Sequence, residues 1–380
     1  MPLPLLLLCS VTIFFVLYAP QPLLALFSEQ FAISPAISGS LMSLTMLPLA
    51  IAPIFYGLLL AKRNVLKVLR LTMILLAISC VLFPLCEDFR LLQVLRFVQG
   101  LLLPAALTSM TGYIGERYQG EHIQQKMGWY IASTIVGGYF GRMLAASFAE
   151  WFTWQSFYYV IAALLLILAS SIRSRHGAVT VKAAASPRDY LRPLKDRPLI
   201  ALYLAVFCMF FCFAALMNYL PFILKDSFAI TASQDIGLVY TGYLIGAVLS
   251  VSSPWLLRHS RSAKHFLLSV FTLYSLTLAL MQGSNLWLFI TAFTLFCAAM
   301  FMIHTTAAGY ANRISSAKAT VTNGAYVSFY YSGGALGSFL PGFIYQYFGQ
   351  TGFLLTLLLV SLCGAWCVRQ TQAKPVNHTV

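Results

Sequence analysis

Long apolar runs dominate the chain, and short polar segments separate them. A helix that crosses the hydrocarbon core of a bilayer needs about 20 mostly apolar residues. The runs are continuous and do not alternate with polar positions, which favours helices over the strands of a membrane barrel. The sequence predicts twelve spanning helices, at about 4–27, 35–60, 66–86, 89–113, 126–149, 154–172, 199–224, 235–257, 264–283, 285–311, 320–346 and 350–369.

Composition supports a membrane protein. Apolar residues make up 60% of the chain and charged residues only 9%, whereas soluble domains carry about 25% charged residues. So little charge cannot cover a water-facing surface, but it suits a surface that faces lipid. The N-terminal run has no basic region before it and no clear cleavage site, so we expect it to stay as the first membrane helix.

The basic residues lie in short clusters between the apolar runs, which argues against nucleic-acid binding despite a net charge of +14. Alternate loops hold 20 of them, and the opposite loops hold only Arg90 and Lys225. Cytoplasmic loops of membrane proteins are enriched in Lys and Arg. Both termini are therefore predicted to be cytoplasmic, which fits an even number of spans.

The longest polar loop, 173–198, is basic and lies near the middle of the chain. It predicts a cytoplasmic linker between an N-terminal six-helix bundle, 1–172, and a C-terminal bundle with a short cytoplasmic tail, 199–380. At an offset of 196, six residues of the first half meet identical residues of the second. The pairs are Arg117 and Arg313, Gly128 and Gly324, Tyr130 and Tyr326, Gly137 and Gly333, Gly138 and Gly334, and Gly141 and Gly337. Two parallel repeats are known in transporters.

Three motifs carry a resemblance to a known family: Gly57–Asn64 after the second helix, Leu92-x-x-x-Arg96-x-x-Gln99-Gly100 in the fourth, and Gly137-Gly138-x-x-Gly141-Arg142 in the fifth. With these motifs the chain resembles the major facilitator superfamily. It departs from the loop motif at Ala61, where the family has aspartate, and at Asn64, where it has glycine. Pro20-Gln21-Pro22, Asn218-Tyr219 and His304 further resemble the bacterial drug:H+ antiporters with twelve spans.

The resemblance implies the major facilitator fold: an all-α membrane protein of twelve helices in two parallel six-helix repeats. It also implies transport by alternating access without a cofactor, driven by a proton gradient. Helices one, four, seven and ten would line the cavity, which places Gln21, Arg96, Asn218 and His304 on it. Lys62 and Arg63, in the loop motif, would take part in the conformational change.

Arg96 and Arg142 are the charged side chains that lie clearly inside predicted spans and not near their ends, where charge is costly and often functional. Arg96 lies eight residues after Asp88 and Arg142 eight before Glu150, so each is expected about 12 Å deep. One interpretation is a substrate or coupling site that favours anions. In the other, each guanidinium binds helix carbonyls and fixes the packing.

Three neutral candidates complete the predicted polar centre. His304, the histidine within a span, can titrate near neutral pH and is a candidate for proton coupling; alternatively it donates to a neighbouring helix. Gln21 and Asn218 lie near prolines in the first and seventh helices, and either bind substrate or join helices.

Six glycines are candidates for close helix packing and gating: Gly137, Gly138, Gly141, Gly333, Gly334 and Gly337. No phosphate-binding loop, catalytic triad or metal-ligand cluster is present, so we expect neither an enzyme nor a metalloprotein. We expect a monomeric transporter in a bacterial inner membrane, exporting a small organic molecule with proton coupling. The alternative is a carrier of an anionic metabolite or siderophore.

Overall fold

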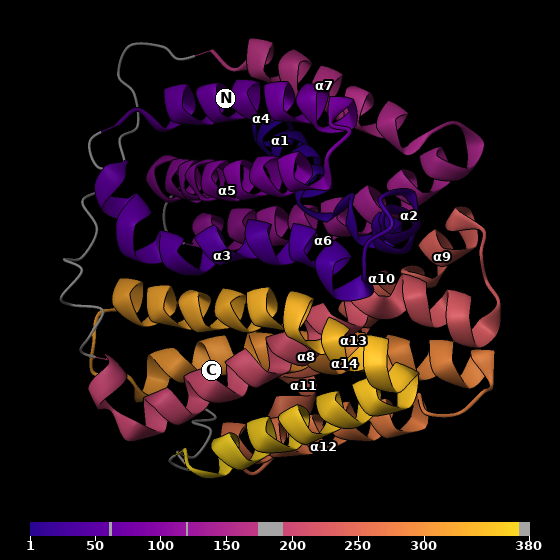
Figure 1. The fold of residues 1–380 in the computed structure, drawn as a ribbon. Helices are drawn as coiled ribbons and strands as arrows, with labels where there is room; N and C mark the ends of the chain where they lie inside the picture. Colours follow the sequence, from indigo (N-terminus) through magenta and orange to yellow (C-terminus); the bar gives the residue numbers. More distant parts are fainter. Residues whose placement is uncertain (61–62, 119–120, 174–192, 372–380) are drawn as a thin grey trace. The chain divides into compact units, whose positions relative to one another are not determined.

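The computed structural model describes residues 1–60, 63–118, 121–173 and 193–371, and every regular element among them is helical (Figure 1). The α-helices are α1 (Leu3–Tyr18), α2 (Leu24–Gln30), α3 (Pro35–Leu59), α4 (Val65–Leu82), α5 (Phe89–Arg117), α6 (Glu121–Trp151), α7 (Trp154–Ser171), α8 (Arg197–Phe228), α9 (Ser233–Val239), α10 (Thr241–Leu249), α11 (Ser253–Arg258), α12 (Ala263–Leu280), α13 (Leu286–Ile314) and α14 (Ala319–Arg369). Short 3-10 turns are η1 (Gln21–Leu23), η2 (Phe83–Leu85), η4 (Pro193–Lys195) and η5 (Ser250–Ser252).

The helices account for the twelve predicted spans. Ten described helical segments are long and apolar enough to cross a membrane. α14 has 51 residues, which would extend about 75 Å as one helix, far beyond a hydrocarbon core of about 30 Å. Its backbone breaks at Gly349, where φ is 62° and ψ is −163°, so α14 supplies two spans. α6, with 31 residues, is long enough to be the twelfth, but it is not among the ten segments that are also apolar enough.

Two predicted spans are each built from three or more pieces. The first is α1, η1 and α2, because Pro20 and Pro22 have no backbone N–H to donate to the preceding turn. The eighth is α9, α10, η5 and α11. Hydropathy reports the length of an apolar run and does not resolve such breaks.

The described chain falls into two compact units. The first comprises 1–33, 40–184 and 231–240, and the second comprises 34–39, 185–230 and 241–380. The predicted boundaries at 172 and 198 stay a prediction, because most of the linker lies outside the described residues. Each unit is described by itself below.

In the first unit, α1 and α6 approach closely at two glycines. A Cβ atom added to Gly137 would lie 2.7 Å from the carbonyl oxygen of Val11, and one added to Gly141 would lie 2.9 Å from the Cα of Phe15. The two helices therefore pack backbone against backbone at these points.

In the second unit, α8 and α14 repeat this arrangement. A Cβ at Gly333 would overlap the carbonyl oxygen of Phe207, and one at Gly337 would overlap that of Phe211. Phe207 is Val11 plus 196 and Phe211 is Phe15 plus 196, so partners as well as glycines follow the offset. The repeat predicted from sequence is thus present in the helix contacts.

The first span of each unit ends in the same way, with an alanine in a left-handed backbone conformation. Ala32 and Ala229, 197 residues apart, both adopt a left-handed backbone, with φ of 49° and 55°. Ile33 N–H then donates to the Ser28 carbonyl at 2.9 Å, and Ile230 N–H to the Leu224 carbonyl at 3.0 Å. These bonds cap the carbonyl ends of α2 and α8.

Candidate functional site

Arg96 lies on α5 and is fully buried in the first unit. Its guanidinium has five N–H donors, and five acceptors surround it: Leu41 O at 3.1 Å, Val16 O at 2.8 Å, Gln99 Oε1 at 2.7 Å, Leu17 O at 2.9 Å and Met42 Sδ at 3.7 Å. An incoming anion would have to displace one of these acceptors. This geometry supports the interpretation in which Arg96 fixes helix packing.

The proline at position 20 explains why α1 needs a donor from another helix. In a regular helix the Val16 carbonyl would accept from the N–H of residue 20. Pro20 has none, and Arg96 Nη1 supplies the missing bond. A cation near a helix C-terminus is also favoured by the helix dipole.

The neighbours of Arg96 extend its hydrogen bonds to α3 and α4. Gln99 Nε2 donates to Ser79 Oγ on α4 at 3.1 Å. The Thr45 hydroxyl on α3 shares its proton between the Leu41 carbonyl of its own helix, at 2.9 Å, and the Arg96 carbonyl, at 3.2 Å. Arg96 and Gln99 therefore join α1, α3, α4 and α5. The family motif Arg96-x-x-Gln99 has a structural explanation here, since both residues lie on one helix face.

Arg142 lies on α6, in the same unit, with 1% of its surface exposed. Its Nε donates to Gln21 Oε1 and its Nη1 to the Gly138 carbonyl at 2.5 Å. The guanidinium carbon lies 4.0 Å from the ring centre of Tyr18 and 5.7 Å from that of Tyr240. Both distances are within the range of cation–π attraction.

The two arginines converge on one short segment. Arg96 binds the carbonyls of residues 16 and 17, and Arg142 contacts the side chains of Tyr18 and Gln21. The structure therefore brings three of the predicted site residues, Gln21, Arg96 and Arg142, to the end of α1. The sequence did not predict a role for Tyr240, which directly follows α9 and whose ring lies near Arg142. No motif around Tyr240 indicates this contact.

His304 lies on α13 of the second unit and pairs with Tyr326 on α14. The Tyr326 hydroxyl lies 2.9 Å from His304 Nδ1 and donates to the His304 carbonyl at 3.0 Å. A hydroxyl has one proton, so both bonds together require Nδ1 to carry a hydrogen and leave Nε2 as the acceptor. The ring of Tyr330 lies 4.8 Å from the imidazole.

Asn218 is fully buried on α8, one residue before Tyr219. The Tyr219 hydroxyl donates to the carbonyl of Ser338 on α14 at 3.2 Å. Asn218 therefore lies on the helix that packs against Gly333 and Gly337 of α14. Its role in substrate binding stays a prediction.

The predicted gating residues divide into three groups. Gly137, Gly141, Gly333 and Gly337 pack helices within a unit, as described above. Gly138 and Gly334 offer their carbonyls to the side chains four residues on, Arg142 and Ser338. Lys62 lies outside the described residues, and Arg63 is exposed.

Asn64, which stands where the loop motif has glycine, has a clear structural role. Its Oδ1 accepts from the N–H groups of Leu66 and Lys67, at 3.0 and 3.1 Å. It therefore caps the N-terminus of α4, where four N–H groups lack partners within the helix. This capping role of Asn64 concerns the stability of α4, and the gating role of the loop motif stays a prediction.

Comparison with known proteins identifies the class. The family model described as Major Facilitator Superfamily matches residues 6–338, and the chain belongs to this superfamily. It is 24% identical over 363 residues to an uncharacterized transporter of Buchnera aphidicola (Schizaphis graminum), covering 92% of this chain and 86% of that one. It is also 24% identical to the uncharacterized MFS-type transporter YybF of Bacillus subtilis, covering 92% and 88%.

Solved structures agree on the fold. The bacterial homologue of the lysosomal transporter Spinster aligns with a TM-score of 0.76 at 12% identity, over 97% of this chain and 96% of that one. The nucleoside transporter NupG aligns with a TM-score of 0.79 at 13% identity, over 97% and 98%. The predicted superfamily, fold class and absence of enzymatic function are confirmed, and the protein is a multi-pass membrane transporter.

Proposed function

We propose that this transporter exports a small organic molecule across a bacterial inner membrane by alternating access, with inward proton movement as the energy source. The buried centre at the end of α1 carries this proposal. There, Arg142 lies between the Gln21 amide and two tyrosine rings. Buried ionisable groups of membrane helices commonly mark substrate or ion pathways.

The two arginines have different roles in this proposal. Arg96 is held by five acceptors, so it stabilises the unit. Arg142 faces side chains, Gln21 and Tyr18, that can rearrange when a substrate binds. A guanidinium stays protonated, so Arg142 tunes a proton carrier and does not itself release the proton.

His304 is the proposed proton carrier. Its Nε2 can accept a proton while Nδ1 stays bonded to Tyr326, so charging the imidazole does not break the bond between α13 and α14. The proposed coupling uses this imidazole in the second unit and the fixed charge of Arg142 in the first.

The alternative function is transport of an anionic metabolite such as a carboxylate. The observation that favours it is the same permanent positive charge, buried at 1% exposure beside an amide. In this case Arg142 binds the anion directly, and either direction of transport is compatible.

Proteoliposomes containing a pH-sensitive dye test the coupling. A ligand is first found by screening sugars, amino acids, nucleosides, carboxylates and cationic dyes for a rise in unfolding temperature, since ligands of the folded state stabilise it. We expect that ligand to move protons across the membrane, and an imposed ΔpH to accelerate its flux. Flux indifferent to ΔpH contradicts proton coupling.

His304→Gln separates the two functions. It should remove the proton response while leaving exchange of ligand across the membrane without ΔpH. Arg142→Gln should abolish binding if the ligand is an anion, and leave binding of a neutral ligand within a few fold.

A further inference from the structure

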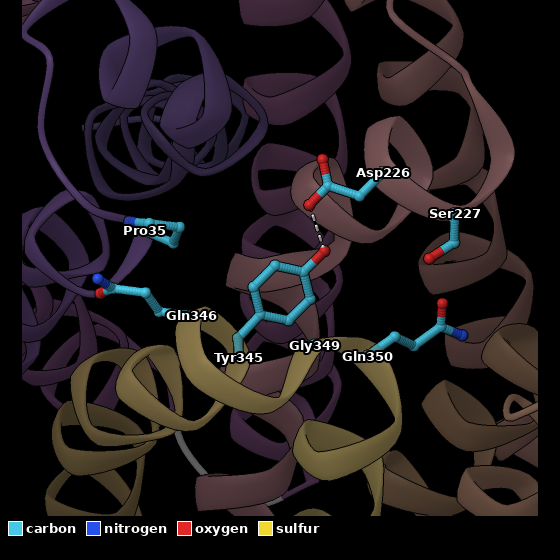
Figure 2. Close-up of a pocket in the computed structure, with 7 residues that line it drawn as sticks. All are labelled: Pro35, Asp226, Ser227, Tyr345, Gln346, Gly349 and Gln350. Carbon is cyan, nitrogen blue, oxygen red and sulfur yellow. Dashed lines mark hydrogen bonds between the residues drawn. The ribbon is translucent and has the colours of Figure 1, made fainter.

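A pocket of about 430 Å³ lies in the second unit, and neither Arg142 nor His304 lines it. Its walls come from the end of α8, the turn within α14 and the first residue of α3. The lining residues are Pro35, Asp226, Ser227, Tyr345, Gln346, Gly349 and Gln350 (Figure 2). All seven belong to the second unit.

Asp226 is the charged side chain among these seven, and Tyr345 holds it in place. The Tyr345 hydroxyl donates to Asp226 Oδ2 at 2.8 Å, as the dashed line in Figure 2 shows. Within the described part of the chain, the Asp226 carboxylate forms no ion pair and accepts no second side-chain hydrogen bond. Oδ1 is therefore an available anionic acceptor.

The rest of the pocket offers neutral donors and acceptors. Among the described residues, the side chains of Ser227 and Gln346 form no hydrogen bond. Gln350 Nε2 donates to the Met281 carbonyl at 2.9 Å, which leaves its Oε1 as an acceptor. In Figure 2, Gln346 and Gln350 flank Tyr345 on opposite sides of the pocket.

The first unit has an equivalent pocket of about 490 Å³, lined by Leu26, Glu29, Gln30, Ala149, Phe152, Thr153, Trp154 and Gln155. Glu29 plus 197 is Asp226, and Ala149 plus 196 is Tyr345. A carboxylate thus stands at the same place in both repeats. The residue beside the carboxylate differs between the two pockets. Tyr345 donates a hydrogen bond to Asp226, whereas Ala149, at the equivalent position, has no hydroxyl group.

This chemistry selects the ligand class. One carboxylate favours a ligand with one positive charge, and the amides and the Ser227 hydroxyl suit its polar groups. A divalent metal prefers several oxygen ligands in a closer cage, and no group of three acidic, His or Cys side chains occurs among the described residues. The volume falls in the range of about 300–1,000 Å³ that is typical of small-molecule sites.

Lys225, the residue before Asp226 on α8, does not line the pocket. Neighbours at i and i+1 on a helix point in different directions. The net charge of the lining is therefore that of Asp226.

We propose that this pocket binds a small organic ammonium bearing hydroxyl groups, with the ammonium on Asp226 Oδ1 and the hydroxyl groups on Gln346, Gln350 and Ser227. The site shares no residue with the centre at Arg142, and the proposal does not depend on the direction of transport or on proton coupling.

Glucosamine and N-acetylglucosamine test the proposal as matched probes, because acetylation removes the charge and keeps the remaining hydroxyls. The purified full chain in detergent micelles is titrated with each, with saturation-transfer NMR as the readout. We expect glucosamine to bind in the millimolar range or tighter and N-acetylglucosamine to bind at least about tenfold more weakly.

Asp226→Asn should weaken glucosamine binding at least about tenfold, since a charged hydrogen bond is lost. Glu29→Gln, in the equivalent pocket, is the matched control and should leave the Kd within about twofold. Gln346→Leu, at an exposed position, should weaken binding a few fold and provides an independent variant if Asp226→Asn unfolds.

Three results would overturn the proposal. These are equal binding of the two probes, wild-type affinity in both Asp226→Asn and Gln346→Leu, or competition by calcium chloride at concentrations equal to those of glucosamine.

Discussion

The two units share a backbone plan but carry different chemistry at matching positions. Arg142 in the first unit and Ser338 in the second stand 196 residues apart. Each side chain donates to the carbonyl four residues earlier, that of Gly138 at 2.5 Å or Gly334 at 2.7 Å. The longer Arg142 side chain also reaches Gln21 and Tyr18. The Ser338 side chain is too short to reach the equivalent positions.

Arg96 shows the same difference. Its counterpart at the 196-residue offset is Ala292, a buried residue of α13. Arg96 and Arg142, the buried arginines of the part of the chain that the structure describes, therefore both belong to the first unit. The second unit has aromatic side chains such as Tyr219 and Tyr330 near its seam. The two repeats therefore share the way their helices pack, while the buried polar side chains at matching positions differ.

The largest expected effect comes from removing Arg96. Arg96→Leu leaves buried carbonyls of α1 and α3 without their donor, and breaking a buried charged network costs about 3–5 kcal/mol. Unfolding of the purified protein in detergent should show this loss. Arg90→Gln, an exposed arginine on the same helix, should change stability by less than about 0.5 kcal/mol. Similar stability of the two variants would refute the packing role.

The glycine seams should respond alike in both units. Gly137→Ala and Gly333→Ala each force a Cβ against backbone atoms of the facing helix, so each should cost about 1–3 kcal/mol. Gly115→Ala and Gly309→Ala are controls, because a Cβ there meets nothing within 4 Å. A loss in only one unit would show that the seams are not equivalent.

The divergent pair should respond differently. Arg142→Gln should lower transport of the cargo at least about tenfold, or about 1.4 kcal/mol, while Ser338→Ala should keep it within about twofold. Initial rates in proteoliposomes measure both. Equal losses would mean that the position, and not the guanidinium, matters.

The smallest effect concerns the left-handed alanines. Ala32→Gly and Ala229→Gly relieve a conformation that disfavours a Cβ by about 1–2 kcal/mol, offset by the greater chain entropy of glycine. Each variant should gain up to about 1 kcal/mol in unfolding free energy. Destabilisation of both would show that these alanine side chains contribute more through packing than their backbone conformation costs.

Sequence alone predicted the helices, because each is an apolar run of the length that a bilayer requires. It also predicted the repeat, since close backbone packing tolerates only glycine at Gly137 and Gly333. It did not predict the break of the first span into α1, η1 and α2, although Pro20 and Pro22 were visible signals of it.

The candidate site was predicted in part. Gln21, Arg96 and Arg142 were recognised because polar side chains are rare in membrane spans. Their partners were not, since Arg96 binds carbonyls 55 and 80 residues away in sequence and any residue can supply a carbonyl. The missing N–H of Pro20 was the one local clue that α1 would need an outside donor.

The glycine seams also have a kinetic consequence. Helices that interlock through side-chain ridges and grooves must lift one row over another before they shift. At Gly333 and Gly337 the nearest atoms of the facing helix are all backbone atoms of Phe207 and Phe211, so no side chain stands in the path. We expect the energy surface for sliding along α8 to be correspondingly smooth, so that a single added methyl group raises the barrier to motion as well as the energy of the packed state.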